Sequence, residues 1–178
     1  MRKGTSLKDY IIHGIFFTMY GFVKYIPAPI GNILRYIVVK PFIKKIGSCR
    51  IAEGVTLYYP YRISIGNGVR LNEYSFLSGF GGIELKDGVG IGNGVKLFTS
   101  EHCLKYYDVP ITESDLIPGK IVIEENAAVA TNSIVLKNVT IGKNAFIGAG
   151  SVVTDDVPPN AISAGSPAKV IKYREKRK

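Results

Sequence analysis

Two histidines, His13 and His102, are the side chains of this sequence best suited to acid–base chemistry. A neutral imidazole takes up a proton near physiological pH and can release it within the same reaction, as a general base must. His13 lies in an apolar run, where a packed or interfacial histidine is expected. His102 ends a polar stretch and is the candidate general base, with a surface histidine at the edge of a loop as the alternative.

The residues beside His102 add no second reactive group. Glu101 and Cys103 adjoin it, but neighbouring residues of an extended strand point to opposite sides, so adjacency alone makes no catalytic pair. Cys49 and Cys103 lack the spacing of a metal site or a disulfide framework, and we expect reduced thiols in a cytosolic compartment. A zinc centre with three histidine ligands needs more histidines than the chain has. No metal site is predicted.

A six-residue period organises the chain on both sides of His102. A helix repeats every 3.6 residues and a plain strand every two, so neither explains this period. Three hexads suit one triangular coil, and the pattern therefore predicts a solenoid whose leading aliphatic residues share one axis. These residues are Ile65, Leu71 and Leu77, then Leu85, Ile91 and Leu97, and finally Ile123, Val129, Val135, Ile141, Ile147 and Val153.

Glycine and asparagine recur after these aliphatic positions, where a tight corner needs a left-handed or crowded backbone. Examples are Gly66, Gly92, Gly142, Asn144 and Gly148. One buried aliphatic side chain per hexad does not offset the entropy of ordering six residues. We therefore expect hydrogen bonds between coils and association of subunits to contribute to stability.

The N-terminal segment is apolar and basic. Residues 10–23 carry no charge but are fewer than the roughly 20 residues that a membrane span needs. Asp9 interrupts the entry of a signal peptide and no clear cleavage site follows. We expect a helical segment that lies on a membrane surface or packs on the body or on a sister subunit, and these alternatives stay open.

The formal net charge of +9 is concentrated at the two ends. Residues 1–50 hold nine basic side chains and one acidic one, and residues 169–178 hold six and one. The remaining residues hold eight basic and twelve acidic side chains, so the body is mildly acidic. This distribution does not favour a nucleic-acid binder.

Residues 141–172, IGKNAFIGAGSVVTDDVPPNAISAGSPAKVIK, resemble the C-terminal signature of the hexapeptide-repeat acyltransferases. The resemblance extends over about residues 46–172, and it is greatest for sugar and polysaccharide O-acetyltransferases of the maltose and galactoside acetyltransferase type. It implies an all-β fold, a left-handed parallel β-helix solenoid, and a homotrimer with sites between subunits. The handedness is implied by the resemblance only.

The resemblance also implies three regions. Residues 1–45 form the N-terminal apolar helical segment, and residues 46–160 form the β-helix domain, with a loop excursion at 103–122. Residues 161–178 form a C-terminal extension with a short basic tail.

In this family a histidine near the end of a coil takes the proton from the acceptor hydroxyl, which then attacks acetyl-CoA directly. His102 matches that base, and Asn72 lies 30 residues before it, at the offset of a substrate-site asparagine. The cofactor positions that match are Thr131, Ala149 and Thr154 beside the pantetheine arm, and Lys169 and Lys172 beside the phosphates. A corner asparagine and a solvated basic tail are the alternatives for Asn72 and the lysines.

Two positions depart from the family pattern. Residues 128–130 read Ala-Val-Ala where many relatives have Trp-Ile-Gly, and Asp155 stands where the family is often basic. Both departures bear on the cofactor contacts and leave His102 unaffected.

The sequence thus predicts an acetyl-CoA-dependent O-acetyltransferase of a sugar hydroxyl, in surface polysaccharide or glycan-precursor biosynthesis. The alternatives are an N-acetyltransferase of an amino sugar and a non-catalytic β-helix scaffold. The expected location is cytoplasmic, with peripheral contact to the inner face of the membrane left open.

Overall fold

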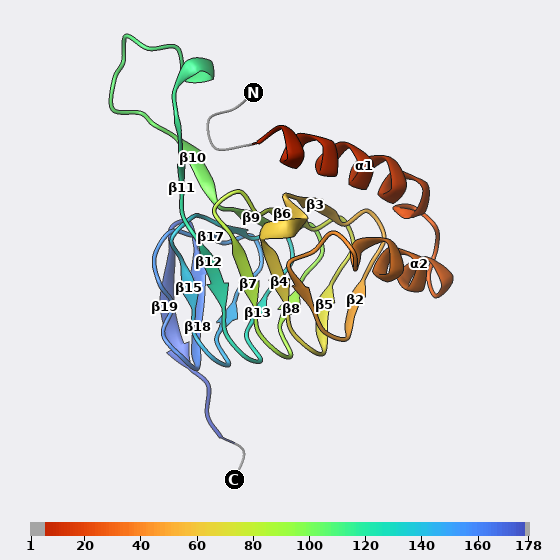
Figure 1. The fold of residues 1–178 in the computed structure, drawn as a ribbon. Helices are drawn as coiled ribbons and strands as arrows, with labels where there is room; N and C mark the ends of the chain where they lie inside the picture. Colours follow the sequence, from red (N-terminus) through yellow and green to blue (C-terminus); the bar gives the residue numbers. More distant parts are fainter. Residues whose placement is uncertain (1–5, 177–178) are drawn as a thin grey trace.

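Three parallel sheets wrap around one apolar core in the computed structural model, which describes residues 6–176 (Figure 1). The chain visits the sheets in turn, so each coil places one strand on every face of a prism. Arg2, Lys3, Arg177 and Lys178, which belong to the predicted basic ends, lie outside the described residues.

We name the faces in the order in which the chain reaches them. Face A consists of β1 (Lys45–Ile46), β4 (Ile63–Ile65), β7 (Ile83–Leu85), β12 (Ile121–Ile123) and β15 (Thr140–Ile141). Face B consists of β2 (Cys49–Ile51), β5 (Val69–Leu71), β8 (Gly90–Ile91), β13 (Ala128–Val129), β16 (Phe146–Ile147) and β18 (Ala161–Gly165), with β19 (Ala168–Tyr173) antiparallel at its end. Face C consists of β3 (Thr56–Tyr58), β6 (Phe76–Ser78), β9 (Lys96–Phe98), β14 (Ile134–Val135) and β17 (Val152–Val153).

The leading aliphatic residues of the hexads stack from coil to coil. On face C, Leu97 lies in register with Leu77 on one side and with Val135 on the other. The twelve leading residues predicted from the period are all buried. The predicted parallel β-helix solenoid is confirmed, and each hexad supplies one strand and one corner.

The corners are tight for two different reasons. Asn144 has a φ of 59°, a left-handed conformation that asparagine tolerates better than most residues. At Gly92 the limit is space, because a Cβ atom there would lie 2.7 Å from the backbone nitrogen of Thr131. The sequence predicted both the left-handed backbone and the crowding at these corners.

In the first three coils the inserted residues lie at the edge where face C passes into face A, the C–A edge. The first insertion holds the short helix η1 (Pro60–Arg62), and the second spans residues 79–82. The third is an antiparallel hairpin, here called the arm, which projects away from the solenoid (Figure 1). The arm contains β10 (Ser100–His102), η2 (Ile111–Glu113) and β11 (Leu116–Pro118).

Two helices precede the first coil, α1 (Leu7–Val23) and α2 (Ile30–Val39), so the predicted N-terminal helical segment is confirmed. Ser6 and Asp9 cap α1 by exchanging side-chain hydrogen bonds with each other's backbone. Phe16, Tyr20 and Val39 are buried and join the core cluster of the solenoid. The helical hairpin is therefore packed on the first coil through one side.

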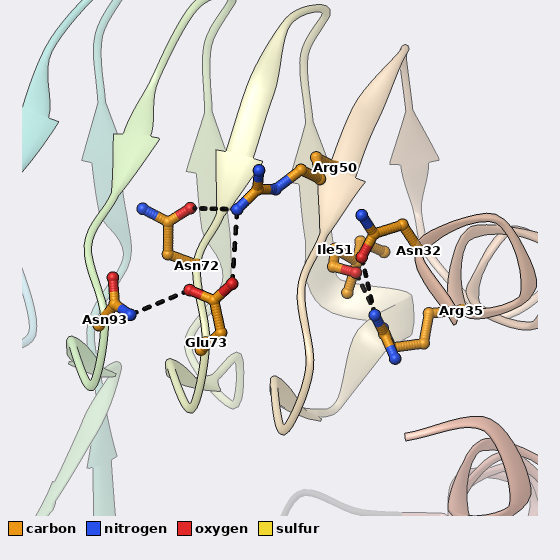
Figure 2. A network of polar contacts seen from close by, with 7 residues as sticks. All are labelled: Asn32, Arg35, Arg50, Ile51, Asn72, Glu73 and Asn93. Carbon is orange, nitrogen blue, oxygen red and sulfur yellow. Dashed lines mark hydrogen bonds and ion pairs between the residues drawn. The ribbon is translucent and has the colours of Figure 1, made fainter. Parts of the chain in front are cut away.

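Arg35 joins the helices to the solenoid (Figure 2). Its buried guanidinium donates from Nε to the carbonyl of Ile51 at 2.9 Å, from Nη1 to that of Ile26 at 2.7 Å, and from Nη2 to Oδ1 of Asn32 at 2.7 Å. These bonds satisfy a charge that burial would otherwise destabilise. They also bond carbonyls between α1 and α2 that helical hydrogen bonds leave unpaired.

Candidate functional site

His102 lies on the arm, at the end of β10, opposite Leu116 of β11. Its half-buried ring approaches a residue from the returning half of the arm, because Nδ1 lies 3.0 Å from Oγ of Ser114. The Ser114 hydroxyl in turn donates to the carbonyl of Ile111 at 2.8 Å. The three groups form one hydrogen-bonded series.

This series accommodates the imidazole tautomer that a general base needs. The Ser114 hydroxyl has a single hydrogen, and the Ile111 carbonyl lies within reach to accept it. In the tautomer with the ring proton on Nδ1, the Ser114 oxygen accepts that proton from His102. The lone pair of Nε2 is consequently available to take a proton, as a general base requires.

The neighbours of His102 behave as the strand argument predicted. Glu101 points elsewhere and pairs with Lys137, with Oε1 and Nζ 3.1 Å apart. The thiol of Cys103 is free and lines a small cavity of about 200 Å³ within the arm, together with Tyr106, Val109, Glu113, Ser114 and Asp115. Ser114 itself was not predicted, because only the pairing of the arm brings it to His102.

Asn72 lies at a different edge, where face B passes into face C, the B–C edge. Its Oδ1 accepts from Nη2 of Arg50 at 3.3 Å, and the same guanidinium reaches Glu73 at 3.5 Å (Figure 2). Asn93 of the next coil donates to the other oxygen of Glu73 at 2.9 Å. Within one chain the structure does not bring Asn72 and His102 together, because face C lies between their edges.

Two of the predicted cofactor residues share the B–C edge with Asn72. Thr131 follows β13 and Ala149 follows β16, and both are exposed. The backbone nitrogen of Gly150 donates to the carbonyl of Thr131 at 2.9 Å, so the two corners stack directly. The edge therefore presents a column of small side chains along the solenoid axis.

Thr154 and Lys169 meet at the C–A edge through Asp155. The hydroxyl of Thr154 donates to Oδ2 of Asp155 at 2.9 Å, and Nζ of Lys169 lies 3.4 Å from the same oxygen. These contacts, first that of Thr154 and then that of Lys169, lower the pKa of Asp155. The residue that departs from the family pattern thus pairs with a predicted phosphate ligand. Lys172 is exposed on β19 opposite Ile162.

A groove of about 670 Å³ runs along face A beside the root of the arm. Its lining combines aromatic and charged side chains: Tyr61 and Phe80, with Lys44, Arg62, Glu84 and Lys120. Glu84 bonds to Lys120 and Lys86, and these two bonds lower its pKa to about 2. No pattern in the sequence indicated this groove, because its lining combines strand residues of face A with residues of three insertions far apart in the chain.

Sequence comparison identifies the repeats. Residues 120–155 match the family described as bacterial transferase hexapeptide (six repeats). The predicted resemblance is confirmed. Within residues 6–176, no group of three or more histidine, cysteine or acidic side chains is arranged to hold a metal ion.

Relatives of the hexapeptide repeats include several acetyltransferases. The putative acetyltransferase C18B11.09c of Schizosaccharomyces pombe is 42% identical over 94 residues, which cover 52% of this chain and 44% of that protein. A 2,3,4,5-tetrahydropyridine-2,6-dicarboxylate N-acetyltransferase of Staphylococcus aureus is 46% identical over 52 residues, or 29% of this chain and 22% of that protein. The chain thus spans less than half the length of these curated relatives.

Solved structures share the fold over almost the whole chain. A hexapeptide-repeat acetyltransferase from Vibrio cholerae, complexed with acetyl coenzyme A, superposes with a TM-score of 0.87 at 22% identity, covering 98% of this chain and 93% of that chain. A maltose O-acetyltransferase from Clostridium difficile has a TM-score of 0.87 at 23% identity, covering 96% and 90%. At 22% and 23% identity, this likeness establishes the shared fold alone.

Proposed function

We propose that this protein transfers an acetyl group from acetyl-CoA to a hydroxyl of a sugar or glycan, with His102 as the general base. The observation that carries the proposal is the hydrogen-bonded series from His102 through Ser114 to Ile111, which accommodates the tautomer whose Nε2 is unprotonated. Support for the reaction class comes from the acetyltransferases that share the repeats and from the neighbour complexed with acetyl coenzyme A.

The reaction requires no covalent enzyme intermediate. Nε2 of His102 takes the proton of the acceptor hydroxyl while the oxygen attacks the thioester carbonyl, forming the new carbon–oxygen bond. When the tetrahedral intermediate collapses, the carbon–sulfur bond breaks and the imidazolium returns the proton to the departing thiolate. The products are the acetyl ester and free coenzyme A.

We propose a homotrimer with the site between subunits, and the positions of two polar residues support it. Asn72 and His102 lie on different edges of one prism, so a single site that uses both takes one from each of two chains. Cyclic association places the B–C edge of one subunit beside the C–A edge of the next. The Asn72 amide then orients the acceptor or bonds the oxyanion.

Acetyl-CoA lies in the groove between those two edges in this proposal. The exposed corners at Thr131 and Ala149 allow the pantetheine arm to approach the backbone, and Thr154 faces it from the other edge. Lys169 and Lys172 supply cations for the nucleotide phosphates. Since Asp155 contacts Lys169, a phosphate competes with that carboxylate for the ammonium group.

Mixing two inactive variants tests both the base and the shared site. We expect His102→Ala and Asn72→Ala each to be strongly impaired, with the oligomer and binding of coenzyme A intact. After subunit exchange, random mixing in equal amounts gives about one quarter of the sites with both native residues, so about one quarter of the native turnover returns. Turnover is followed by release of coenzyme A thiol.

The same experiment can overturn the proposal. Full turnover by His102→Ala contradicts the general base. Absence of turnover in the native protein with every acceptor tested favours the non-catalytic scaffold. Impaired single variants whose mixture stays inactive contradict the site shared between subunits. A mixture of His102→Ala with Ser114→Ala is the matched control. Both changes fall on the same arm, so no site regains a native arm, and the mixture should keep only about half the turnover of Ser114→Ala alone.

N-acetylation of an amino sugar is the second candidate, because one relative is an N-acetyltransferase. The same base and thioester serve both reactions. An acceptor screen separates them: a product that mild alkali hydrolyses is an ester, and one that survives is an amide. We also propose a role in surface polysaccharide or glycan-precursor biosynthesis, and a cytoplasmic location with peripheral contact to the inner face of the membrane.

A further inference from the structure

The helical hairpin of α1 and α2 is apolar on the side that faces away from the solenoid. Phe16, Tyr20 and Val39 are buried beneath it, yet the opposite side leaves large apolar side chains in solvent. We call these residues the outer helical face. They are Leu7, Tyr10, Ile11, Ile15, Met19, Phe22, Tyr25, Ile30, Ile33 and Ile37, and their exposure ranges from 45% at Met19 to 81% at Phe22.

The spacing of these residues makes two continuous stripes. Ile11, Ile15, Met19 and Phe22 follow one another at intervals of four, four and three on α1, which places them on one side of the helix. Ile30, Ile33 and Ile37 follow at intervals of three and four on α2 and likewise lie on one side of that helix. A helix that is apolar all round is normally buried, and an apolar patch of this extent marks an interaction surface.

The charges around the outer helical face are positive. Of the seven basic side chains in residues 6–50, Arg35 is buried and Arg50 contacts Glu73, and the one acidic side chain, Asp9, bonds to Ser6 at the N-cap of α1. Lys8 is exposed at the start of α1 and Lys40 at the end of α2, and the exposed Lys44 and Lys45 follow on the first coil, where Lys44 also lines the face A groove. This pattern complements a surface that is apolar below a layer of negative charge.

The geometry favours a helix pair lying flat on such a surface. None of the helices in residues 6–176 is long and apolar enough to cross a membrane. α1 has 17 residues, about 25 Å of helix, against about 30 Å of hydrocarbon. Figure 1 shows α2 at the end of the solenoid where the coils begin and α1 on the side from which the arm projects.

We propose that the outer helical face binds the surface of an anionic phospholipid bilayer, with its apolar stripes in the headgroup region and the flanking lysines on the lipid phosphates. This inference deepens the proposed function by naming the residues of the membrane contact. One consequence rests on the proposed function: an acceptor carried on a lipid reaches the arm from the side on which α1 lies.

Vesicle co-sedimentation of the full-length protein tests this proposal. The probes are vesicles of phosphatidylcholine alone and of phosphatidylcholine with about 30 mol% phosphatidylglycerol. We expect the native protein to bind the anionic vesicles at least about tenfold more tightly than the neutral ones, and to be released in about 0.5 M salt. The triple variant Phe22→Asn, Ile33→Asn, Ile37→Asn should bind the anionic vesicles at least about tenfold more weakly than the native protein.

The matched control is the triple variant Val170→Asn, Ile171→Asn, Tyr173→Asn, which removes exposed apolar side chains from β19 and should bind vesicles like the native protein. Circular dichroism and the melting temperature establish that both variants are folded. Native protein that stays in the supernatant with anionic vesicles at low salt overturns the proposal, as does unchanged binding by the Phe22 variant.

A second copy of the chain is the competing occupant. If sedimentation velocity shows that the Phe22 variant dissociates while the native protein ignores vesicles, the face is a contact between subunits. Turnover with a soluble acceptor is measured on the same samples. Full turnover without vesicle binding refutes only the lipid surface, and vesicle binding without turnover refutes only the acetyl transfer.

Discussion

The B–C edge and the C–A edge of the solenoid are built from the same repeats, but only the C–A edge accommodates long insertions in the first three coils. At the B–C edge the corners stack closely, as Gly92 does against the backbone of Thr131. At the C–A edge of the first three coils, the chain inserts η1, residues 79–82 and the arm. The regular edge therefore supplies a fixed surface, and the interrupted edge carries the candidate base, His102.

The closeness of the B–C edge predicts the largest effect, on stability. Gly92→Ala places a Cβ atom 2.7 Å from the Thr131 nitrogen and 2.9 Å from the Ala130 carbonyl carbon. Because both contacts are backbone, the coils must separate locally, and we expect a loss of about 1–3 kcal/mol in the free energy of unfolding. Urea denaturation measures it.

Gly90→Ala is the control for this prediction, since its Cβ atom meets only the Ala128 side chain at an ordinary 3.6 Å. It should leave the protein as stable or slightly more stable. Tyr107→Ser, at a fully exposed position of the arm, should also leave unfolding unchanged. Equal stability of the two glycine variants would refute the close stacking of corners at the B–C edge.

The arm predicts the next effect, on turnover. Ser114→Ala removes the acceptor that holds the Nδ1 proton of His102, so the ring rotates and the other tautomer becomes populated. We expect kcat to fall about tenfold, with an unchanged KM for acetyl-CoA. Steady-state kinetics at several pH values measure both.

Recovery of kcat in Ser114→Thr would show that the hydroxyl positions the base, because threonine keeps the hydroxyl. Simple support of the arm would not require that group. Thr112→Ala removes an exposed hydroxyl two residues away and should leave kcat unchanged. If Ser114→Thr is as slow as Ser114→Ala while Thr112→Ala is normal, the hydroxyl is not what positions the base.

The smallest effect concerns Asp155 at the C–A edge. Its lowered pKa keeps the carboxylate ionised at neutral pH, where it pairs with Lys169. Asp155→Asn should free Lys169 and lower the KM for acetyl-CoA about two- to threefold, a modest change because the pair is exposed. The difference should disappear in about 0.5 M salt, and Lys169→Ala should raise KM. A higher KM in Asp155→Asn would contradict competition for the lysine.

Much of the candidate site was readable from the sequence one residue at a time. His102 was selected by residue type, by its position beside a break in the period and by the family resemblance, and Thr131 and Ala149 were selected by that resemblance. Ser114 was not predicted, because twelve residues of arm separate it from His102 and only the β10–β11 pairing brings them together. The roles of Asn72 and of the lysines remain predictions.

In the N-terminal segment, too, the sequence predicted the element and the structure decided its contacts. The sequence left open whether its apolar residues lie on a membrane or pack on the body. The structure assigns Phe16 and Tyr20 to the core and leaves Ile15 and Phe22 exposed. A helix whose residues are nearly all apolar has no sequence signal for which side is covered, so tertiary packing had to decide.

By itself the sequence determined the solenoid, because a strict six-residue period specifies which side chains share an axis and needs only neighbouring residues to be read. Tertiary structure alone decided which edge each polar residue occupies, which hydroxyl lies beside Nδ1 of His102, and which face of the helices is left uncovered. These depend on contacts between segments far apart in the chain, and no local pattern encodes them.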